Sequence, residues 1–211
     1  MDKIRFRYSK TGKARYISHL DLMATMKRGL IRAGLELKYS QGFNPHPYMS
    51  VALPLPVGNE SVCELMDVGL INEGLPELKA VKLPDGITIH DAYKPIRKFK
   101  DIAWIEISMD MHYNQPVNKD FAERIKQRFS EKSIIISKKT KRGSKDLDIS
   151  PLIKDVDVIF NDNIKMTAKI SAQDPTLNAT DLEKALDGEH KPDHMEIKRI
   201  DIYDIVMIPF K

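Results

Sequence analysis

Polar and apolar positions alternate most clearly at the start of the chain. In Lys3–Tyr8, basic side chains alternate with Ile4, Phe6 and Tyr8, which predicts a strand with one apolar face and one basic face. Further strands are predicted at Leu35–Tyr39, Cys63–Leu70 and Ile87–Tyr93. The last of these follows a Pro84-Asp85-Gly86 turn.

A helix is predicted between the first two strands. Ser18 and Asp21 have the spacing of a capping box, and Gly34 supplies a C-terminal stop. Between them, one apolar face contains Leu22, Met26, Leu30 and Ala33. Four prolines within Gly42–Gly58 exclude a regular interior element there, and Glu73–Lys79 predicts a short second helix. The order is that of a ferredoxin-like βαββαβ motif.

The second half of the chain follows a similar order with one strand more. Predicted helices cover Asn118–Phe129 and Thr180–Leu186, and predicted strands cover Ile102–Met109, Ser133–Ser137, Val156–Phe160, Lys165–Ile170 and Glu196–Ile208. We therefore expect an α+β protein made of two tandem ferredoxin-like units with antiparallel sheets. The units would cover residues 1–95 and 101–211, joined near Pro95–Lys100.

Charge is unevenly distributed along the 211 residues. The chain has 34 Lys and Arg against 30 Asp and Glu, a net charge of +4. Residues 1–50 hold ten of the basic groups and three of the acids, so this segment has a charge of +7 and the remainder −3. This asymmetry favours a polyanionic partner such as RNA, although a solvated basic face gives the same pattern.

Other features of the composition exclude several classes of protein. With Cys63 as its only cysteine, the chain alone cannot form an internal disulfide, a thiolate zinc site or a cysteine-ligated iron–sulfur cluster. Its apolar runs are shorter than the roughly 20 residues of a membrane-spanning helix, and Met1–Lys10 lacks a signal-peptide apolar core. We therefore expect a cytoplasmic protein that does not bind a membrane.

The segment Tyr39–Tyr48 is polar, aromatic and stiff at once. Gly42 permits unusual backbone geometry, while Pro45 and Pro47 restrict it. Such a loop can present side chains that read or stack on a ligand; the candidates are Gln41, Phe43, Asn44, His46 and Tyr48. The alternative is a proline-stiffened connection whose polar side chains cap its own backbone.

The start of the predicted helix is the second candidate site. Exposed amides and the positive end of the helix dipole favour anions there, next to His19 and Asp21. Basic side chains that could bind phosphates are Lys10, Lys13, Arg15, Arg28 and Arg32. An ordinary capped helix with a surface histidine would give the same pattern.

Neither site shows a spacing that specifies a metal or a nucleophile. His19, Asp21 and His46 have ligand types suited to a divalent ion, but nothing in the sequence brings them together. No HExxH-like spacing or Gly-x-Ser-x-Gly elbow is present, so we expect no metal and no cofactor. A basic segment at Lys138–Lys145 could track a phosphate backbone or be a solvated loop.

Several motifs together resemble the uncharacterised bacterial radical-SAM-associated domain family. They are Ala14-Arg15-Tyr16-Ile17-Ser18-His19-Leu20-Asp21-Leu22-Met23, Arg28, Arg32-Ala33-Gly34, Tyr39-Ser40-Gln41-Gly42-Phe43-Asn44-Pro45-His46-Pro47, Ala52-Leu53-Pro54-Leu55-Pro56-Val57-Gly58, Glu60-Ser61 and, more loosely, Asp148-Ile149-Ser150-Pro151-Leu152-Ile153. Tyr48 stands where that family commonly has a basic residue, and Ser150 where it often has arginine. The family's domain occurs alone or appended to a B12-binding radical SAM protein, so the resemblance implies such a protein as partner.

The leading hypothesis is a non-catalytic accessory domain that binds RNA or another anionic substrate for a radical SAM enzyme. A second is a metal-independent endoribonuclease with His19 or His46 as general base. A third is a pure docking module that uses the apolar segment Met49–Pro56, which an edge strand would explain equally well. The two candidate sites are expected to lie within reach of one another.

Overall fold

The alternating strand at the start of the chain lies in the middle of the first sheet. In the computed structural model, which describes residues 3–71, 77–140 and 143–210, β1 (Lys3–Lys10) pairs with β3 (Glu60–Gly69) and with β4 (Ile87–Tyr93). The short strand β2 (Met49–Val51) pairs with Met66–Val68 of β3. All three pairings are antiparallel, and the order is β4-β1-β3-β2.

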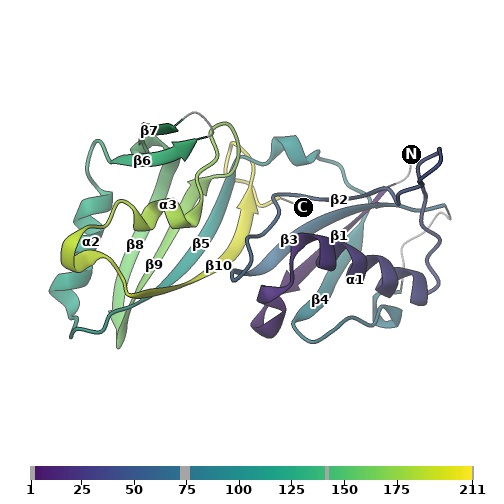
Figure 1. Cartoon of the computed structure of the whole chain (residues 1–211), viewed down its shortest axis with the longest axis horizontal. Helices are drawn as coiled ribbons and strands as arrows, with labels where there is room; N and C mark the ends of the chain where they lie inside the picture. The colour runs from purple at the N-terminus through teal and green to yellow at the C-terminus, as the bar shows by residue number, and fades with distance from the viewer. Residues whose placement is uncertain (1–2, 72–76, 141–142, 211) are drawn as a thin grey trace. The chain divides into compact units, whose positions relative to one another are not determined.

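Helix α1 (His19–Arg32) covers one face of this sheet (Figure 1). As predicted, Ser18 is its N-cap and accepts a hydrogen bond from the Asp21 amide, while Gly34 follows its end with φ +83°. The core between helix and sheet combines Ile4, Phe6 and Tyr8 from β1 with Leu22, Met26 and Leu30 from α1. The opposite face of β1 presents Lys3, Arg5 and Arg7, as the alternation indicated.

The prediction of a strand at Leu35–Tyr39 is wrong. Leu37 and Tyr39 make only isolated bridges, to Leu70 and Pro47, and the strand lies at Met49–Val51, inside the proline-rich segment. The prolines at 45 and 47 precede β2, so they do not interrupt its pairing. The short helix predicted at Glu73–Lys79 falls largely outside the described residues, and the part that is described contains the 3-10 turn η2 (Leu78–Ala80).

A second compact unit covers Lys100–Phe210, after a first that extends to Phe99. Its sheet has the order β10-β5-β9-β8, again entirely antiparallel. The strands are β5 (Trp104–His112), β8 (Ile153–Asn161), β9 (Asn163–Ser171) and β10 (His194–Tyr203). The helices are α2 (Lys119–Phe129) and α3 (Ala179–Glu183), and the remaining 3-10 turns are η1 (Gly12–Tyr16), η3 (Phe99–Asp101), η4 (Ser150–Leu152) and η5 (Gly188–His190). The chain is thus an α+β protein.

The strand predicted at Ser133–Ser137 belongs instead to a separate hairpin. β6 (Ile135–Thr140) pairs with β7 (Gly143–Asp148) in a two-stranded sheet of its own. Of the basic segment Lys138–Lys145, Lys141 and Arg142 lie outside the described residues. The hairpin is fixed where Lys138 forms an ion pair with the buried Asp181 of α3, at 3.1 Å.

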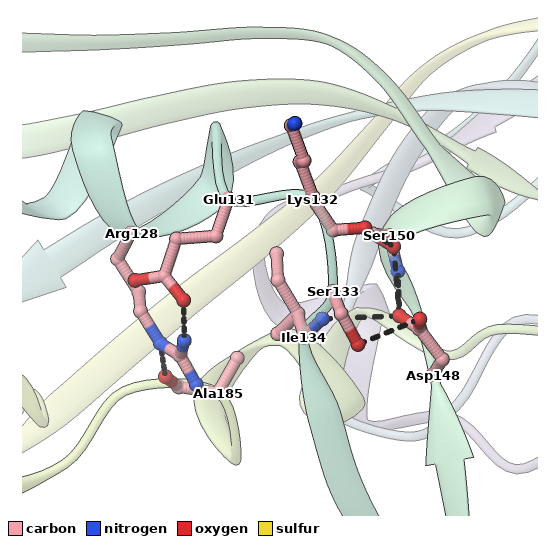
Figure 2. A network of polar contacts seen from close by, with 8 residues as sticks. All are labelled: Arg128, Glu131, Lys132, Ser133, Ile134, Asp148, Ser150 and Ala185. Carbon is pink, nitrogen blue, oxygen red and sulfur yellow. Dashed lines mark hydrogen bonds and ion pairs between the residues drawn. The ribbon is translucent and has the colours of Figure 1, made fainter.

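The Asp148 carboxylate holds the base of this hairpin (Figure 2). It accepts hydrogen bonds from the Ile134 amide at 3.0 Å, the Ser133 hydroxyl at 2.8 Å, and both the amide and the hydroxyl of Ser150 at 3.0 and 2.7 Å. Hydrogen bonds from Ser150, Ile134 and Ser133 hold the pKa of Asp148 well below its usual range. The motif that begins at Asp148 therefore has a structural role here.

No helix in the described ranges is both long and apolar enough to cross a membrane.

Candidate nucleic-acid interface

Residues 38–48 form a hairpin with a hydrogen-bonded base. The Tyr48 amide donates to the Lys38 carbonyl, and the Ser40 amide to the His46 carbonyl, both at 2.8 Å. The Ser40 hydroxyl accepts from the His46 amide at 2.9 Å. Gly69 of β3 joins both arms, because its carbonyl accepts from the Lys38 amide and its amide donates to the Tyr48 carbonyl. We call this segment the 38–48 hairpin.

The tip of the 38–48 hairpin projects into solvent. Gly42, with φ +122°, forms the turn next to Phe43, whose relative exposure is 113%. Gln41, Asn44 and His46 are also exposed, and the Tyr48 ring is 42% exposed. The hairpin therefore presents an uncovered aromatic ring and several hydrogen-bonding groups on a backbone that its own hydrogen bonds fix.

A lysine from α1 supports the base of the hairpin. Lys27 Nζ lies 5.3 Å from the centroid of the Tyr39 ring, and that ring is 37% exposed. Lys38 is exposed beside it. The hairpin thus carries positive charge next to its aromatic side chains.

At the start of the helix, Lys10 differs from its predicted role. Its side chain is buried, and its ammonium donates to the carbonyls of Arg15 and Ile17 at 3.2 and 2.7 Å. Burial lowers the pKa of Lys10, and the charge of Glu64 partly opposes this effect. Lys10 therefore holds the η1 turn through these two carbonyls. Its ammonium is not presented to a phosphate at the surface.

The other residues of the helix start face outward. Lys13 and His19 are exposed, and the Arg15 guanidinium carbon lies 5.1 Å from the centroid of the Tyr16 ring, which is 61% exposed. The Arg15 carbonyl accepts from the Gly58 amide at 2.9 Å, which ties η1 to the segment after β2. We call Lys13, Arg15, Tyr16 and His19 the helix-start cluster.

The two predicted sites lie at opposite ends of α1. The strand register places Lys10 opposite Ser61 and Lys3 opposite Gly69, which are about 23 Å apart along β1. The helix-start cluster lies near the first pair and the 38–48 hairpin near the second, as Figure 1 shows. The expectation that they approach one another is therefore wrong, because α1 runs the length of the sheet between them.

Arg28 and Arg32 point away from the hairpin. The Arg32 guanidinium donates to the Lys82 carbonyl at 3.3 Å, on the side of α1 toward β4, and Arg28 is exposed one turn earlier. Lys27 occupies the opposite flank, next to Tyr39. Lys27 is therefore the basic residue of α1 whose contact with the hairpin the structure shows.

The apolar segment Met49–Pro56 is largely used in the fold. Met49 and Val51 pair with β3 and pack against the core, and Ala52 is 2% exposed. Of the two interpretations that the sequence left open, the edge strand is the one observed for this part of the segment.

Sequence reasoning missed three residues of this surface. Tyr16, Lys27 and Lys38 contribute exposed rings or charge, yet only their neighbours were singled out. An aromatic residue one position from a basic one, as in Arg15-Tyr16 and Lys38-Tyr39, was the available signal.

His19, Asp21 and His46 do not form a metal site. Over residues 3–71, 77–140 and 143–210, no three His, Cys, Asp or Glu side chains form a group that could hold an ion. Asp21 instead accepts from the Ser18 hydroxyl at 2.7 Å, as part of the helix cap.

Comparison with known proteins gives the family and the fold. No curated protein matches the chain. Among solved structures it is similar to a chain of the "Crystal Structure of a Cbf5-Nop10-Gar1 Complex", with 16% identity and a TM-score of 0.50. That similarity covers 92% of this chain and 48% of the other, so this chain spans about half the length of that one, and the likeness concerns the fold alone. Residues 3–179 match the family described as "Uncharacterized protein conserved in bacteria (DUF2344)", and the chain therefore belongs to this family.

Proposed function

We propose that this chain is a non-catalytic binding domain for single-stranded RNA, acting in the cytoplasm beside a B12-binding radical SAM protein. The observation that carries the RNA part is the complete exposure of Phe43 at the tip of the 38–48 hairpin. Exposed aromatic rings on positively charged surfaces are the usual platforms on which unpaired bases stack.

The surroundings of Phe43 favour a ring that stacks on a base over an exposed ring with no binding role. Two further aromatic rings, Tyr39 and Tyr48, belong to the same hairpin and are partly exposed. Lys27 and Lys38 supply charge for the phosphate backbone. The hydrogen bonds at the base of the hairpin restrict its backbone, so binding would require little further ordering of the main chain.

The helix-start cluster would be a second point of contact on the same strand. Arg15 and Tyr16 again combine a cation with an exposed ring, and Lys13 adds charge. A separation of about 23 Å along β1 corresponds to several nucleotides of an extended single strand. Gln41, Asn44 and His46 would read base edges at the hairpin, while Arg28 and Arg32 would contact phosphates only on the far flank of α1.

The RNA proposal is tested by binding of a labelled single-stranded RNA, measured by fluorescence anisotropy between 50 and 500 mM salt. Phe43→Ala should weaken binding by about 1–3 kcal/mol, the usual contribution of one stacked base. Ile96→Ala is the matched control, because Ile96 is 96% exposed and lies outside the hairpin. Lys38→Gln should reduce the salt slope by about one. Absence of binding at 50 mM salt, or equal losses for the Phe43 and Ile96 variants, would contradict the proposal.

The partner proposal rests on the resemblance of the N-terminal motifs. With Cys63 buried and single, these 211 residues cannot ligate a three-cysteine cluster, so any radical chemistry would reside in another protein. Mixing the purified chain with a B12-binding radical SAM protein of the same genome should give a complex that co-elutes on a sizing column. Separate elution at micromolar concentrations, with and without RNA, would argue against this partner.

We further propose that the two units are tandem ferredoxin-like folds. When the β6–β7 hairpin is set aside, each unit places its fourth strand beside its first and its second beside its third, with a helix after the first strand. The hairpin would then be an insertion between the first helix and the second strand of the second unit.

A further inference from the structure

The first sheet has a groove on the face opposite α1, which the proposed RNA surface does not use. The groove has a volume of about 520 Å³, within the usual range of roughly 300–1,000 Å³ for small-molecule sites. Its polar lining comes from β1 and the residues just after it, and from β4: Arg7, Ser9, Thr11, His90, Asp91 and Tyr93. Neither the 38–48 hairpin nor α1 contributes to it.

Strand geometry explains why these side chains gather there. Arg7 and Ser9 alternate with the core residues Phe6 and Tyr8, so they point to the opposite face of β1. Arg7 lies opposite Asp91, but the next pair is Tyr8 with Ile89. His90 is thus the extra residue of a β-bulge, a distortion that often redirects a side chain at a binding site.

A buried ion pair lies next to the groove. Arg5 is bound to Asp67 by two hydrogen bonds and lies over the Phe99 ring, 4.3 Å from its centroid. Arg5 is therefore occupied by the fold, and Arg7 is the guanidinium that lines the groove. Burial raises the pKa of Tyr93, which lies opposite Arg5, so its ring stays neutral.

The lining combines groups that recognise different parts of one ligand class. A guanidinium with neighbouring hydroxyls suits a phosphate group, through charge-assisted hydrogen bonds. A carboxylate such as that of Asp91 can accept hydrogen bonds from the two hydroxyls of a ribose. The rings of His90 and Tyr93 provide flat surfaces for a base.

We propose that this groove binds a ribonucleoside monophosphate, either free or as the phosphate-bearing end of an RNA strand. Arg7, Ser9 and Thr11 would bind the phosphate, Asp91 the ribose, and the rings of His90 and Tyr93 the base. This site does not depend on the RNA surface proposed above, because the two lie on opposite faces of the sheet.

The test is titration of the full chain with UMP and AMP, followed by calorimetry and by amide chemical shifts. Uridine, 2′-deoxy-UMP and inorganic phosphate serve as comparison probes. UMP should bind more tightly than uridine or phosphate alone, with shifts centred on β1 and β4. Absence of binding at millimolar UMP, or shifts centred on the 38–48 hairpin, would overturn the proposal.

Variants assign the individual roles. Arg7→Gln should weaken UMP binding about tenfold and abolish the preference for UMP over uridine. Arg124→Gln, which removes an exposed arginine from α2, should change neither. Asp91→Asn should abolish the preference for UMP over 2′-deoxy-UMP. If Arg7→Gln fails to fold, Asp91→Asn and His90→Ala, both at exposed positions, decide the question. Unchanged preferences in the folded variants would overturn the proposal.

A third set of probes distinguishes the two sources of the ligand. A trinucleotide with a 5′-phosphate that displaces UMP, while its unphosphorylated form does not, would assign the groove to an RNA end. Displacement by neither, with UMP still bound, would assign it to the free nucleotide. Failure of all nucleotides would leave the hairpin proposal intact, because that proposal is tested by Phe43→Ala.

Discussion

Arg5 and Asp67 form a buried ion pair across the first sheet, joined by two hydrogen bonds. Arg5 Nε lies 2.7 Å from Asp67 Oδ1, Nη2 lies 3.0 Å from Oδ2, and the two side chains are 1% and 9% exposed. Because the two residues are paired between β1 and β3, their charges are satisfied within the sheet. The basic face of β1 is therefore partly neutralised by its neighbour.

Removal of the Asp67 carboxylate should strongly destabilise the protein. Asp67→Ala leaves the Arg5 charge buried without its acceptor, which typically costs roughly 3–5 kcal/mol. Urea unfolding should show this as a lower midpoint. Asp157→Ala is the control, because the Lys126–Asp157 pair is exposed and such pairs contribute about 0–1 kcal/mol. Similar losses for the two variants would contradict the burial argument.

The buried Lys10 should give the protein a stability that rises at alkaline pH. Burial lowers the pKa of Lys10 in the folded state below 10.5, so between these two pKa values the unfolded chain binds more protons. The free energy of unfolding should therefore increase as the pH rises through this window. Lys10→Met should lack this component, which the difference between the two pH profiles measures. Parallel profiles would mean that Lys10 has an ordinary pKa.

Asp148 should produce a dependence of the same sign in acid, because its folded-state pKa is also lowered. Hydrogen bonds from Ser150, Ile134 and Ser133 lower its pKa, so its stabilising effect is complete above pH 4 and is lost as the pH falls toward the folded pKa. Asp148→Asn should flatten this part of the stability profile. Asp146→Asn is a matched control, because Asp146 lies on the same exposed hairpin outside the carboxylate network. An equal change in both variants would contradict the assignment.

Gly86 should not tolerate alanine. Its φ is +87°, and a Cβ atom would lie 2.2 Å from the Thr11 carbonyl oxygen. The Thr11 amide also donates to the Gly86 carbonyl at 2.8 Å, so the two backbones cannot easily separate. Gly34→Ala is the control, because φ there is +83° and the space around it is open. Thermal unfolding should show a cost of about 1–3 kcal/mol for Gly34→Ala, from backbone strain, and a larger one for Gly86→Ala.

Much of the fold could be predicted from local patterns. Helix α1 had a cap, an apolar face and a glycine stop, β1 had clear alternation, and β4 has the bounds that were predicted for it. β2 was hidden because an edge strand of three residues needs little hydrophobic signal and lay among prolines. β7 was hidden because its side chains are exposed or half-buried, and no apolar period marks it.

The candidate site was harder to predict than the fold. Residue types identified Phe43 and Arg15 as candidates, but only the strand register shows that the hairpin and the helix start lie at opposite ends of α1. Similarly, Lys10 had the composition of a surface cation, whereas the structure buries it below η1. The groove opposite α1 depends on a β-bulge at His90, a feature that has no sequence signature in this chain.

The hydrogen-bonded base of the 38–48 hairpin makes affinity and local order inseparable. Ser40 makes two of its closing contacts with His46, yet it lies away from the tip. Without these hydrogen bonds the backbone under Phe43 would be more mobile, and the ring would adopt many orientations. Binding would then have to order the hairpin, which lowers the affinity. A substitution of Ser40, which touches no ligand, could therefore weaken binding as much as a substitution of Phe43 itself. Residues near the tip can vary only if the hydrogen bonds between Ser40 and His46 are kept.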